Sequence, residues 1–344
     1  MVKRLPLSLR SVVGVGLVVG FAACSSNNND GVVPGTTAPD SGGAGNEGGP
    51  GVDSGGTTDA GGDSGGPAFE FPKPTACPAS KFKTLVVVGD SISDVGGGGG
   101  GGQQPFYRTL LVKNDDALYP EWKGFDLSTC WGLDPTTGVT KVSKGGAIAT
   151  VPPNNTPGDQ GVLLNQVTGL PATLPGPVLV VGTIGGNDVQ GGLITVLTGT
   201  PAQLQAKIDA FIAGFGAAMS ELTKPDRFGA GVKVSVLMTN VYDPSGGTGH
   251  FYYEPKKATC SGALGFWPDG KPTGPLLAQW NTAMATEAAK YPPVRLVELR
   301  APFDSHAVST PVAQNWFYQD CIHPSTLGHN AVRGAFWGGM VALQ

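Results

Sequence analysis

The chain has 344 residues, a net charge of −4 and only 14% charged side chains. It contains no basic stripe that would gather phosphates, so nucleic acid is not an expected partner. A low-complexity N-terminal part precedes about 275 residues of mixed composition, which is enough for one α/β domain with a large core.

The first segment has the pattern of an export signal. Basic residues within the first ten positions precede an apolar run at 12–23, which is followed by Cys24. The run is shorter than the ~20 residues that a membrane-spanning helix needs, and small residues at a cut site are typical of a secretory signal. Because two alanines directly precede Cys24, the site resembles a bacterial lipoprotein cleavage box. We therefore expect residues 1–23 to be removed and Cys24 to carry lipid; an ordinary signal peptide is the alternative.

The next segment has the composition of a tether. Residues 25–68 contain 14 glycines and no aromatic, Lys or Arg residue. Such a segment buries too little apolar surface to offset its ordering entropy, and as a Gly-rich coil it spans roughly 35–40 Å. The sequence thus predicts a disordered tether at 24–68 and a folded domain at 69–344. The predicted location is the cell envelope, on the periplasmic or the outer face of a bacterial membrane.

Strands and helices alternate from residue 84 onward. Short apolar runs that end at glycine predict buried strands at 84–88 and 178–181. A capping box at Thr200 begins a helix whose apolar positions recur at helical spacing as far as Leu222. A strand, a helix, a strand and a terminal helix are expected at 232–239, 276–290, 294–299 and 325–343. This alternation predicts an α/β fold, with a parallel sheet flanked by helices.

Polar motifs follow the predicted strands, at the edge where open parallel sheets bind ligands. Ser91 follows the first strand, the segment 185–188 follows the second, and 240–244 follows the third. Asp320 and His323 lie in a turn before the last helix. A serine needs a base to become a nucleophile, and an imidazole needs a carboxylate to fix its tautomer. Ser91, His323 and Asp320 are therefore a candidate catalytic triad.

These motifs resemble those of the SGNH hydrolases, also called the GDSL esterases and lipases. The matching segments are Gly-Asp-Ser-Ile-Ser-Asp at 89–94, Gly-Gly-Asn-Asp at 185–188, Asp-Cys-Ile-His-Pro at 320–324 and, more weakly, Lys-Gly-Gly-Ala at 144–147. The resemblance covers roughly 84–332 and implies a three-layer, flavodoxin-like SGNH fold. The chain departs from the family in the glycine run that follows Asp94 and in lacking an Asn before the Gly-Gly-Ala segment.

The resemblance also implies a role for each site residue. Ser91 is the nucleophile, His323 the general base and Asp320 its orienting carboxylate. The donors to the oxyanion are the Ser91 N–H, the Gly146 N–H and the Asn187 amide. The implied activity is that of an exported serine hydrolase, which cleaves carboxylic esters through an acyl-enzyme and requires no metal or organic cofactor. We expect a monomer whose substrate is a lipid, an acetylated glycan or a small ester.

Each of these residues also has a plainer interpretation. A serine after a strand often caps a helix, Asn187 would also suit a turn, and Gly146 would also suit a flexible loop. An inactive relative that uses the cleft for binding is one alternative protein. A metal-dependent phosphoesterase that uses Asp90 with Asp320 and His323 is another. The remaining histidines, expected in a helix or in loops without a matching carboxylate motif, are His250, His306 and His329.

Two further groups of side chains have an expected place. The loop aromatics and a nearby histidine either line a cleft or belong to the core: His250, Phe251, Tyr252, Tyr253 and Trp267. Beyond Cys24 there are four cysteines, which in an exported protein favours two disulfides over zinc, because no two cysteines have metal-ligand spacing. Three connectivities are possible. We predict Cys260–Cys321, which would hold the turn between Asp320 and His323 rigid, and hence Cys77–Cys130.

Overall fold

The computed structural model describes residues 73–94, 104–253, 258–260, 264, 267–311, 314–318 and 320–343. The predicted signal at 1–23, the tether at 24–68 and the glycine run 96–102 lie outside these residues. The side chains at 253, 258 and 259 are also not described.

Five parallel strands form the central sheet, in the order β2-β1-β3-β4-β7. Their bounds are β1 (Thr84–Gly89), β2 (Val139–Lys141), β3 (Val178–Thr183), β4 (Val234–Thr239) and β7 (Val294–Val297). All residues of β1 and β3 are buried, because both faces of these central strands are covered. From β1 the chain moves out to β2 and then returns to β3 on the other side. This reversal creates a topological switch point between β1 and β3, where open sheets of this kind bind ligands.

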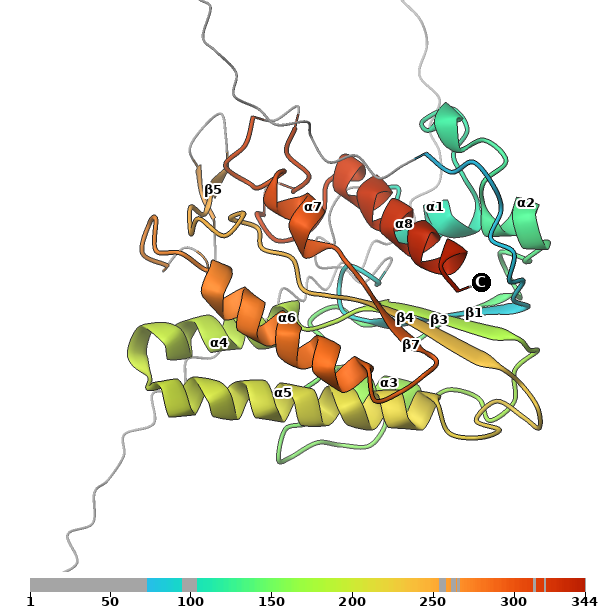
Figure 1. Cartoon of the computed structure of the whole chain (residues 1–344), viewed down its shortest axis with the longest axis horizontal. Helices are drawn as coiled ribbons and strands as arrows, with labels where there is room; N and C mark the ends of the chain where they lie inside the picture. Colours follow the sequence, from blue (N-terminus) through green and yellow to red (C-terminus); the bar gives the residue numbers. More distant parts are fainter. Residues whose placement is uncertain are drawn as a thin grey trace, which may run out of the picture.

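Helices cover both faces of the sheet (Figure 1). One layer contains α3 (Leu163–Thr168), α4 (Gly186–Thr198), α5 (Pro201–Leu222) and α6 (Gly274–Ala288). The other contains α1 (Tyr107–Val112), α2 (Leu127–Trp131), α7 (Arg300–Asp304) and α8 (Thr326–Val341). A short 3-10 turn at Pro120–Trp122 and a two-stranded antiparallel ribbon, β5 (Tyr252–Tyr253) with β6 (Ala258–Thr259), complete the described elements. The predicted α/β class with a parallel sheet is confirmed.

The long helix α5 begins as the sequence predicts. Thr200 Oγ1 accepts a hydrogen bond from the Gln203 N–H, and the Gln203 side chain accepts one from the Thr200 N–H. Pro201 occupies the first helical position, where its missing N–H costs nothing. Phe211 and Phe215 are fully buried on the apolar face that the periodicity defines. Local capping and periodicity are therefore sufficient to place this helix.

Both predicted disulfides are present. Cys77–Cys130 joins the segment before β1 to α2, and Cys260–Cys321 joins the residue after β6 to the turn before α8. Cys321 has a φ of 65°, a left-handed conformation that non-glycine residues seldom adopt. The second disulfide thus fixes a tightly turned backbone.

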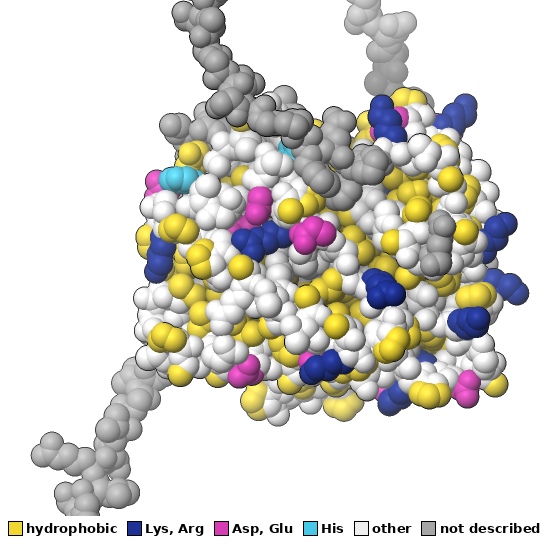
Figure 2. All heavy atoms as spheres, viewed as in Figure 1, with side chains coloured by type: hydrophobic (Ala, Val, Ile, Leu, Met, Phe, Trp, Pro, Cys, Tyr) yellow, Lys and Arg dark blue, Asp and Glu magenta, His cyan; other side chains and the backbone are white. Residues whose placement is uncertain are grey.

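Charged side chains are sparse at the surface. On the face in Figure 2, Lys and Arg side chains are spread among uncharged ones. Within the described part of the chain, no helix combines the length and apolar character needed to cross a bilayer.

Candidate active site

Ser91 lies in the turn that directly follows β1. Gly89 has a φ of 113°, and a Cβ placed there would lie 1.9 Å from the carbonyl oxygen of Thr183 on β3. Only glycine therefore allows the ends of β1 and β3 to approach this closely. The carbonyl of Asp90 then accepts hydrogen bonds from the N–H groups of Ser93 and Asp94, which curls the chain around Ser91.

The structure brings together the three residues of the candidate triad. His323 Nε2 lies 2.7 Å from Ser91 Oγ, and His323 Nδ1 lies 2.7 Å from Asp320 Oδ2. A carboxylate only accepts hydrogen bonds, so Nδ1 carries the proton that faces Asp320. In a neutral imidazole this leaves Nε2 as the acceptor for the Ser91 hydroxyl. This geometry suits Ser91 as a nucleophile, His323 as its base and Asp320 as the acid that orients His323.

Backbone N–H groups of the turn that contains Asp320 favour the ionised form of its side chain. Its Oδ1 accepts hydrogen bonds from the N–H groups of Ile322 and His323, both at 2.9 Å. Burial by itself would raise the pKa of Asp320, but the hydrogen bond and charge of His323, with these backbone donors, keep that pKa below its usual value. Asp320 is therefore ionised, and suited to stabilise an imidazolium.

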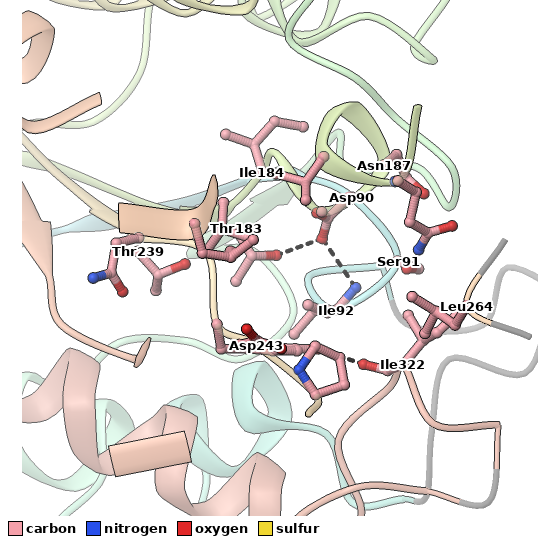
Figure 3. A pocket seen from close by; sticks show the side chains of 18 of the residues that line it. Asp90, Ser91, Ile92, Thr183, Ile184, Asn187, Thr239, Asp243, Leu264 and Ile322 are labelled. Atoms are coloured by element: carbon pink, nitrogen blue, oxygen red, sulfur yellow. Dashed lines mark hydrogen bonds between the residues drawn. The ribbon is translucent and has the colours of Figure 1, made fainter. Parts of the chain in front are cut away.

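Unused donors surround the Ser91 hydroxyl. Among the described residues, the N–H groups of Ser91 and Gly146 have no hydrogen-bond acceptor. Asn187, in the first turn of α4, donates one of its two amide hydrogens to the Ala147 carbonyl at 2.9 Å, which leaves the other free. Figure 3 shows the Asn187 amide pointing toward Ser91. The N–H of Gly145, by contrast, is already bound by Asp94, which favours Gly146 as the donor in this turn.

Two carboxylates that were not predicted as site residues hold the segment 145–150, which includes the Gly-Gly-Ala motif. Asp94 Oδ2 accepts the Gly145 N–H at 2.8 Å, and the other oxygen of Asp94 pairs with Lys141 on β2. Asp188 accepts the N–H groups of Ala149 and Thr150, both at 3.0 Å. Burial raises the pKa of Asp188 against these hydrogen bonds. Both acids belong to the motifs of the sequence, but spacing alone does not reveal which backbone they bind.

Asp90 lies beneath the nucleophile and is almost fully buried. Its Oδ1 accepts the Thr183 hydroxyl at 2.7 Å and the Ile92 N–H at 3.2 Å, as Figure 3 shows. Ser93 Oγ in turn lies 2.8 Å from both the Thr183 hydroxyl and the Tyr107 hydroxyl. Burial raises the pKa of Asp90 to about 6, although these hydrogen bonds and His323 act in the opposite direction. These contacts give Asp90 a structural role in the turn that carries Ser91.

The other histidines lie apart from Ser91. His329 is buried in α8 against Phe106 and Tyr107, and the ring of His306 stacks on Trp316. His250 has no carboxylate motif beside it in the sequence, but the fold brings it a carboxylate partner: its Nδ1 lies 2.6 Å from Asp269 Oδ1. That partner lies 19 residues away, so no local motif announces it.

A pocket opens beside Ser91, at the switch point between β1 and β3 (Figure 3). It is lined by the predicted strand-end residues and by apolar side chains of α4 and α6. Of the aromatic loop, Phe251 lines the pocket, whereas Trp267 is buried and donates its Nε1–H to the Lys271 carbonyl. The side chain of Tyr253 lies outside the described residues. Of the two predicted placements, the cleft therefore applies to Phe251 and the core to Trp267.

A metal-dependent phosphoesterase would need Asp90, Asp320 and His323 to lie together as metal ligands. Within the described ranges, no group of three or more His, Cys, Asp or Glu side chains is placed to hold a metal ion. Asp90, Asp320 and His323 therefore do not form such a group, and this arrangement does not favour the metal-dependent alternative.

Residues 85–335 match the family model described as GDSL-like lipase/acylhydrolase. Because the match covers well over half of the chain, the protein belongs to this family. Family membership makes it a hydrolase of the esterase and lipase class, which acts on esters. No protein with a curated function matches it in sequence.

Solved structures with a similar fold include several lipases. A lipase from a goat rumen metagenome is 12% identical with a TM-score of 0.44. The match covers 74% of this chain and 96% of that lipase. An extracellular lipase from Streptomyces rimosus is 17% identical with a TM-score of 0.38, covering 76% and 100%. A phospholipase A1 from Streptomyces albidoflavus is 16% identical with a TM-score of 0.40, covering 76% and 99%. At such scores these likenesses add nothing to the assignment above.

Proposed function

We propose that the protein is an exported serine hydrolase that cleaves carboxylic esters through an acyl-enzyme. The observation that carries the proposal is the continuous line of hydrogen bonds from Ser91 through His323 to Asp320, with 2.7 Å at each step. This line ends at a pocket, so a substrate carbonyl has room next to the nucleophile.

The first half of the reaction transfers the acyl group to the enzyme. Ser91 Oγ attacks the ester carbonyl carbon, and its proton passes to His323 Nε2. Asp320 stabilises the imidazolium that results. When the tetrahedral intermediate collapses, the bond to the leaving oxygen breaks and His323 donates its proton to that oxygen. An alcohol departs, and the acyl group stays on Ser91.

The second half repeats these steps with water. His323 accepts a proton from water, which attacks the acyl carbon. The bond from that carbon to Ser91 Oγ then breaks, His323 returns the proton to Oγ, and a carboxylic acid departs. In both halves negative charge builds on the carbonyl oxygen. The N–H groups of Ser91 and Gly146 and the amide of Asn187 are the donors assigned to that oxygen, and each such donor typically contributes ~3–4 kcal/mol.

Ser91→Ala tests the proposal. The change removes one oxygen at a half-buried turn, so the fold and the melting temperature should be retained while ester hydrolysis falls by roughly 10⁴-fold or more. His323→Ala should have an effect of similar size. The double variant should be no worse than either single one, because nucleophile and base act as one unit. Hydrolysis of a chromogenic acetate ester provides the measurement.

The same assay separates the alternatives. A serine-reactive phosphonate should inactivate the wild type and add its mass at Ser91, whereas a chelator should have no effect. Inactivation by the chelator alone would favour a metal-dependent phosphoesterase. A folded wild type with no activity on any ester, and with no phosphonate adduct, would favour a binding module. Full activity in Ser91→Ala would refute the proposed triad.

We further propose that the domain acts at the cell envelope, attached through lipid on Cys24. The support is the apolar run at 12–23, which is too short to span a bilayer, and the tether composition that begins immediately after Cys24.

A further inference from the structure

The pocket beside Ser91 has walls of aliphatic and aromatic side chains drawn from five parts of the chain. Its buried apolar lining residues are Ile92, Ile184, Val189, Leu193, Val241 and Leu277, with Phe251 and Leu264 from the loop beyond β4. Apolar surface of this kind gains free energy by covering an apolar ligand, and it offers no hydrogen bonds to a sugar.

Most of the polar side chains in the pocket are already bound within the protein. The Thr273 hydroxyl donates to Asp243 at 2.5 Å, and Asp243 also accepts from the Ser245 N–H and hydroxyl. The amide of Asn240 donates to Glu298 and accepts two backbone N–H groups. Ser91 and Asn187 lie next to each other at the catalytic end of the pocket, and among the described lining residues Gln190 and Thr239 are further side chains with polar atoms left to meet a ligand.

The position of His323 relative to Ser91 decides which half of an ester, the acyl group or the leaving alcohol, occupies the pocket. The leaving oxygen must lie within reach of His323 Nε2, because His323 donates the proton to it. Ser91, Asn187 and Ile322 line the pocket, but His323 is not among the described residues that do so. The pocket therefore extends away from the leaving group, on the side of the acyl carbon. Its occupant is the acyl chain.

The size of the pocket limits the length of that chain. Its volume is about 70 Å³. An engineered apolar cavity of about 150 Å³ holds benzene, so each carbon takes roughly 25 Å³ and this pocket has room for roughly three carbons beyond the carbonyl. Resting on the proposed function, we propose that the enzyme is specific for short acyl groups of about four carbons. Acetyl esters leave the pocket mostly empty, and long acyl chains exceed it.

The proposal is tested by kcat/KM for nitrophenyl esters of acetic, butanoic and hexanoic acid. Each buried methylene should raise kcat/KM about fourfold, so the wild type should prefer butanoyl over acetyl by roughly 15-fold. The gain should stop at hexanoyl. Leu277→Ala removes three carbons from the wall and should raise the hexanoyl-to-butanoyl ratio about tenfold. Leu193→Ala gives the same test should Leu277→Ala fail to fold.

Leu276→Ala is the matched control. Leu276 precedes Leu277 in α6 and is also buried, but it does not line the pocket. Its truncation should lower the melting temperature about as much as Leu277→Ala does, while leaving the ratios of the three esters as in the wild type.

The acetyl ester separates this inference from the proposed function. If acetate hydrolysis is present and requires Ser91, the proposed function stands. A chain-length profile that is flat or falls from acetyl onward, or one that neither alanine variant changes, then overturns the acyl pocket. A wild type that hydrolyses none of the three esters overturns both proposals.

Discussion

Asp94 connects the nucleophile turn to the turn that carries Gly146. It lies three residues after Ser91, yet its carboxylate binds the Gly145 N–H and Lys141, which lie 51 and 47 residues further along the chain. Asp94 holds the peptide that carries the Gly145 N–H. Because the Gly146 N–H belongs to the next peptide along the chain, this contact also fixes its direction. A donor that shifts by an ångström loses much of its effect on the developing oxyanion, while the substrate in its ground state is barely affected.

Asp94→Ala should therefore lower kcat by about tenfold to a hundredfold and change KM by less than about threefold. Asp94→Asn still offers an oxygen to Gly145, so it should recover most of the lost kcat. Steady-state kinetics on the butanoyl ester provide both numbers.

Asp159→Ala is the control for this prediction. Asp159 also pairs with a lysine of the region, Lys144 at 3.2 Å, but it is half exposed and binds no N–H of the Gly-Gly-Ala turn. An exposed pair of this kind contributes little, so kcat should change by less than about twofold. Equal losses in Asp94→Ala and Asp159→Ala would contradict the positioning role.

The buried carboxylate of Asp90 makes the stability of the fold depend on pH. Its pKa is about 6 in the folded protein against 3.8 for an unperturbed group. The folded state therefore binds this proton more tightly than the unfolded state. The resulting stability is fully present below pH 3.8, and it is lost as the pH rises through about 6. Two pKa units correspond to free energy on the order of 2–3 kcal/mol.

Asp90→Asn cannot ionise, so its free energy of unfolding should lack this decline. Urea unfolding of both proteins between pH 4 and 7 gives the comparison. The difference between variant and wild type should shift in favour of the variant as the pH rises. The contribution of Asp304, whose pKa burial also raises to about 6, is common to both proteins and cancels. Parallel pH profiles would show that Asp90 does not titrate in this range.

At the scale of elements, the two disulfides have different expected effects although they close similar loops. The separations are 53 residues for Cys77–Cys130 and 61 for Cys260–Cys321. Chain-entropy estimates give about 4 kcal/mol for either one. Only Cys260–Cys321 ends within the turn of Asp320 and His323, and it ties that turn to the loop that carries Leu264.

Replacing Cys260 and Cys321 together by alanine should lower kcat for the butanoyl ester at temperatures where the protein remains folded. Replacing Cys77 and Cys130 should lower the melting temperature by a similar amount with kcat retained, since that pair lies outside the site. Circular dichroism and kinetics on the same samples would distinguish the two effects. Equal kcat in the two double variants would show that the turn before α8 needs no covalent restraint.

The elements that the sequence predicts are those with a local cause. β1 and β3 are continuous apolar runs, and α5 has its own capping box and periodicity. β2 was not predicted, because its three residues form a strand only through pairing with β1. α4 was not predicted either, since it starts at Gly186 with no side-chain cap. Intrinsic propensity disfavours glycine in helices, so tertiary packing determines that start.

The site residues also divide into those that a local motif predicts and those that depend on tertiary packing. Short motifs identify Ser91, Asn187 and His323 as candidates, because the chemistry requires those residue types. The hydrogen bonds of Asp94 to Gly145 and of Asp188 to Ala149 span 51 and 39 residues. Contacts of that range depend on how the layers pack, and no spacing in the sequence encodes them.

On the scale of the whole molecule, the site is assembled where the strand order reverses. The turn after β1 supplies Ser91, β3 leads into α4 with Asn187, and the turn before α8 supplies His323 from 232 residues away. A rigid parallel sheet positions these loops, while their side chains set the chemistry. The sequence predicts a tether that begins before this unit at residue 24, so attachment and catalysis are predicted to be separable.

Cys24→Ser tests that separation. If lipid on Cys24 anchors the protein, the variant should move from the membrane fraction to the soluble fraction of cells that export it. Its kcat/KM on the butanoyl ester should be unchanged, because the tether composition at 25–68 predicts no packing against the domain. One acyl chain gives only marginal binding, so intact mass analysis of the wild type should show more than one chain at an N-terminal Cys24. A soluble wild type whose N-terminus lies elsewhere would refute the anchor and leave the proposed hydrolase chemistry standing.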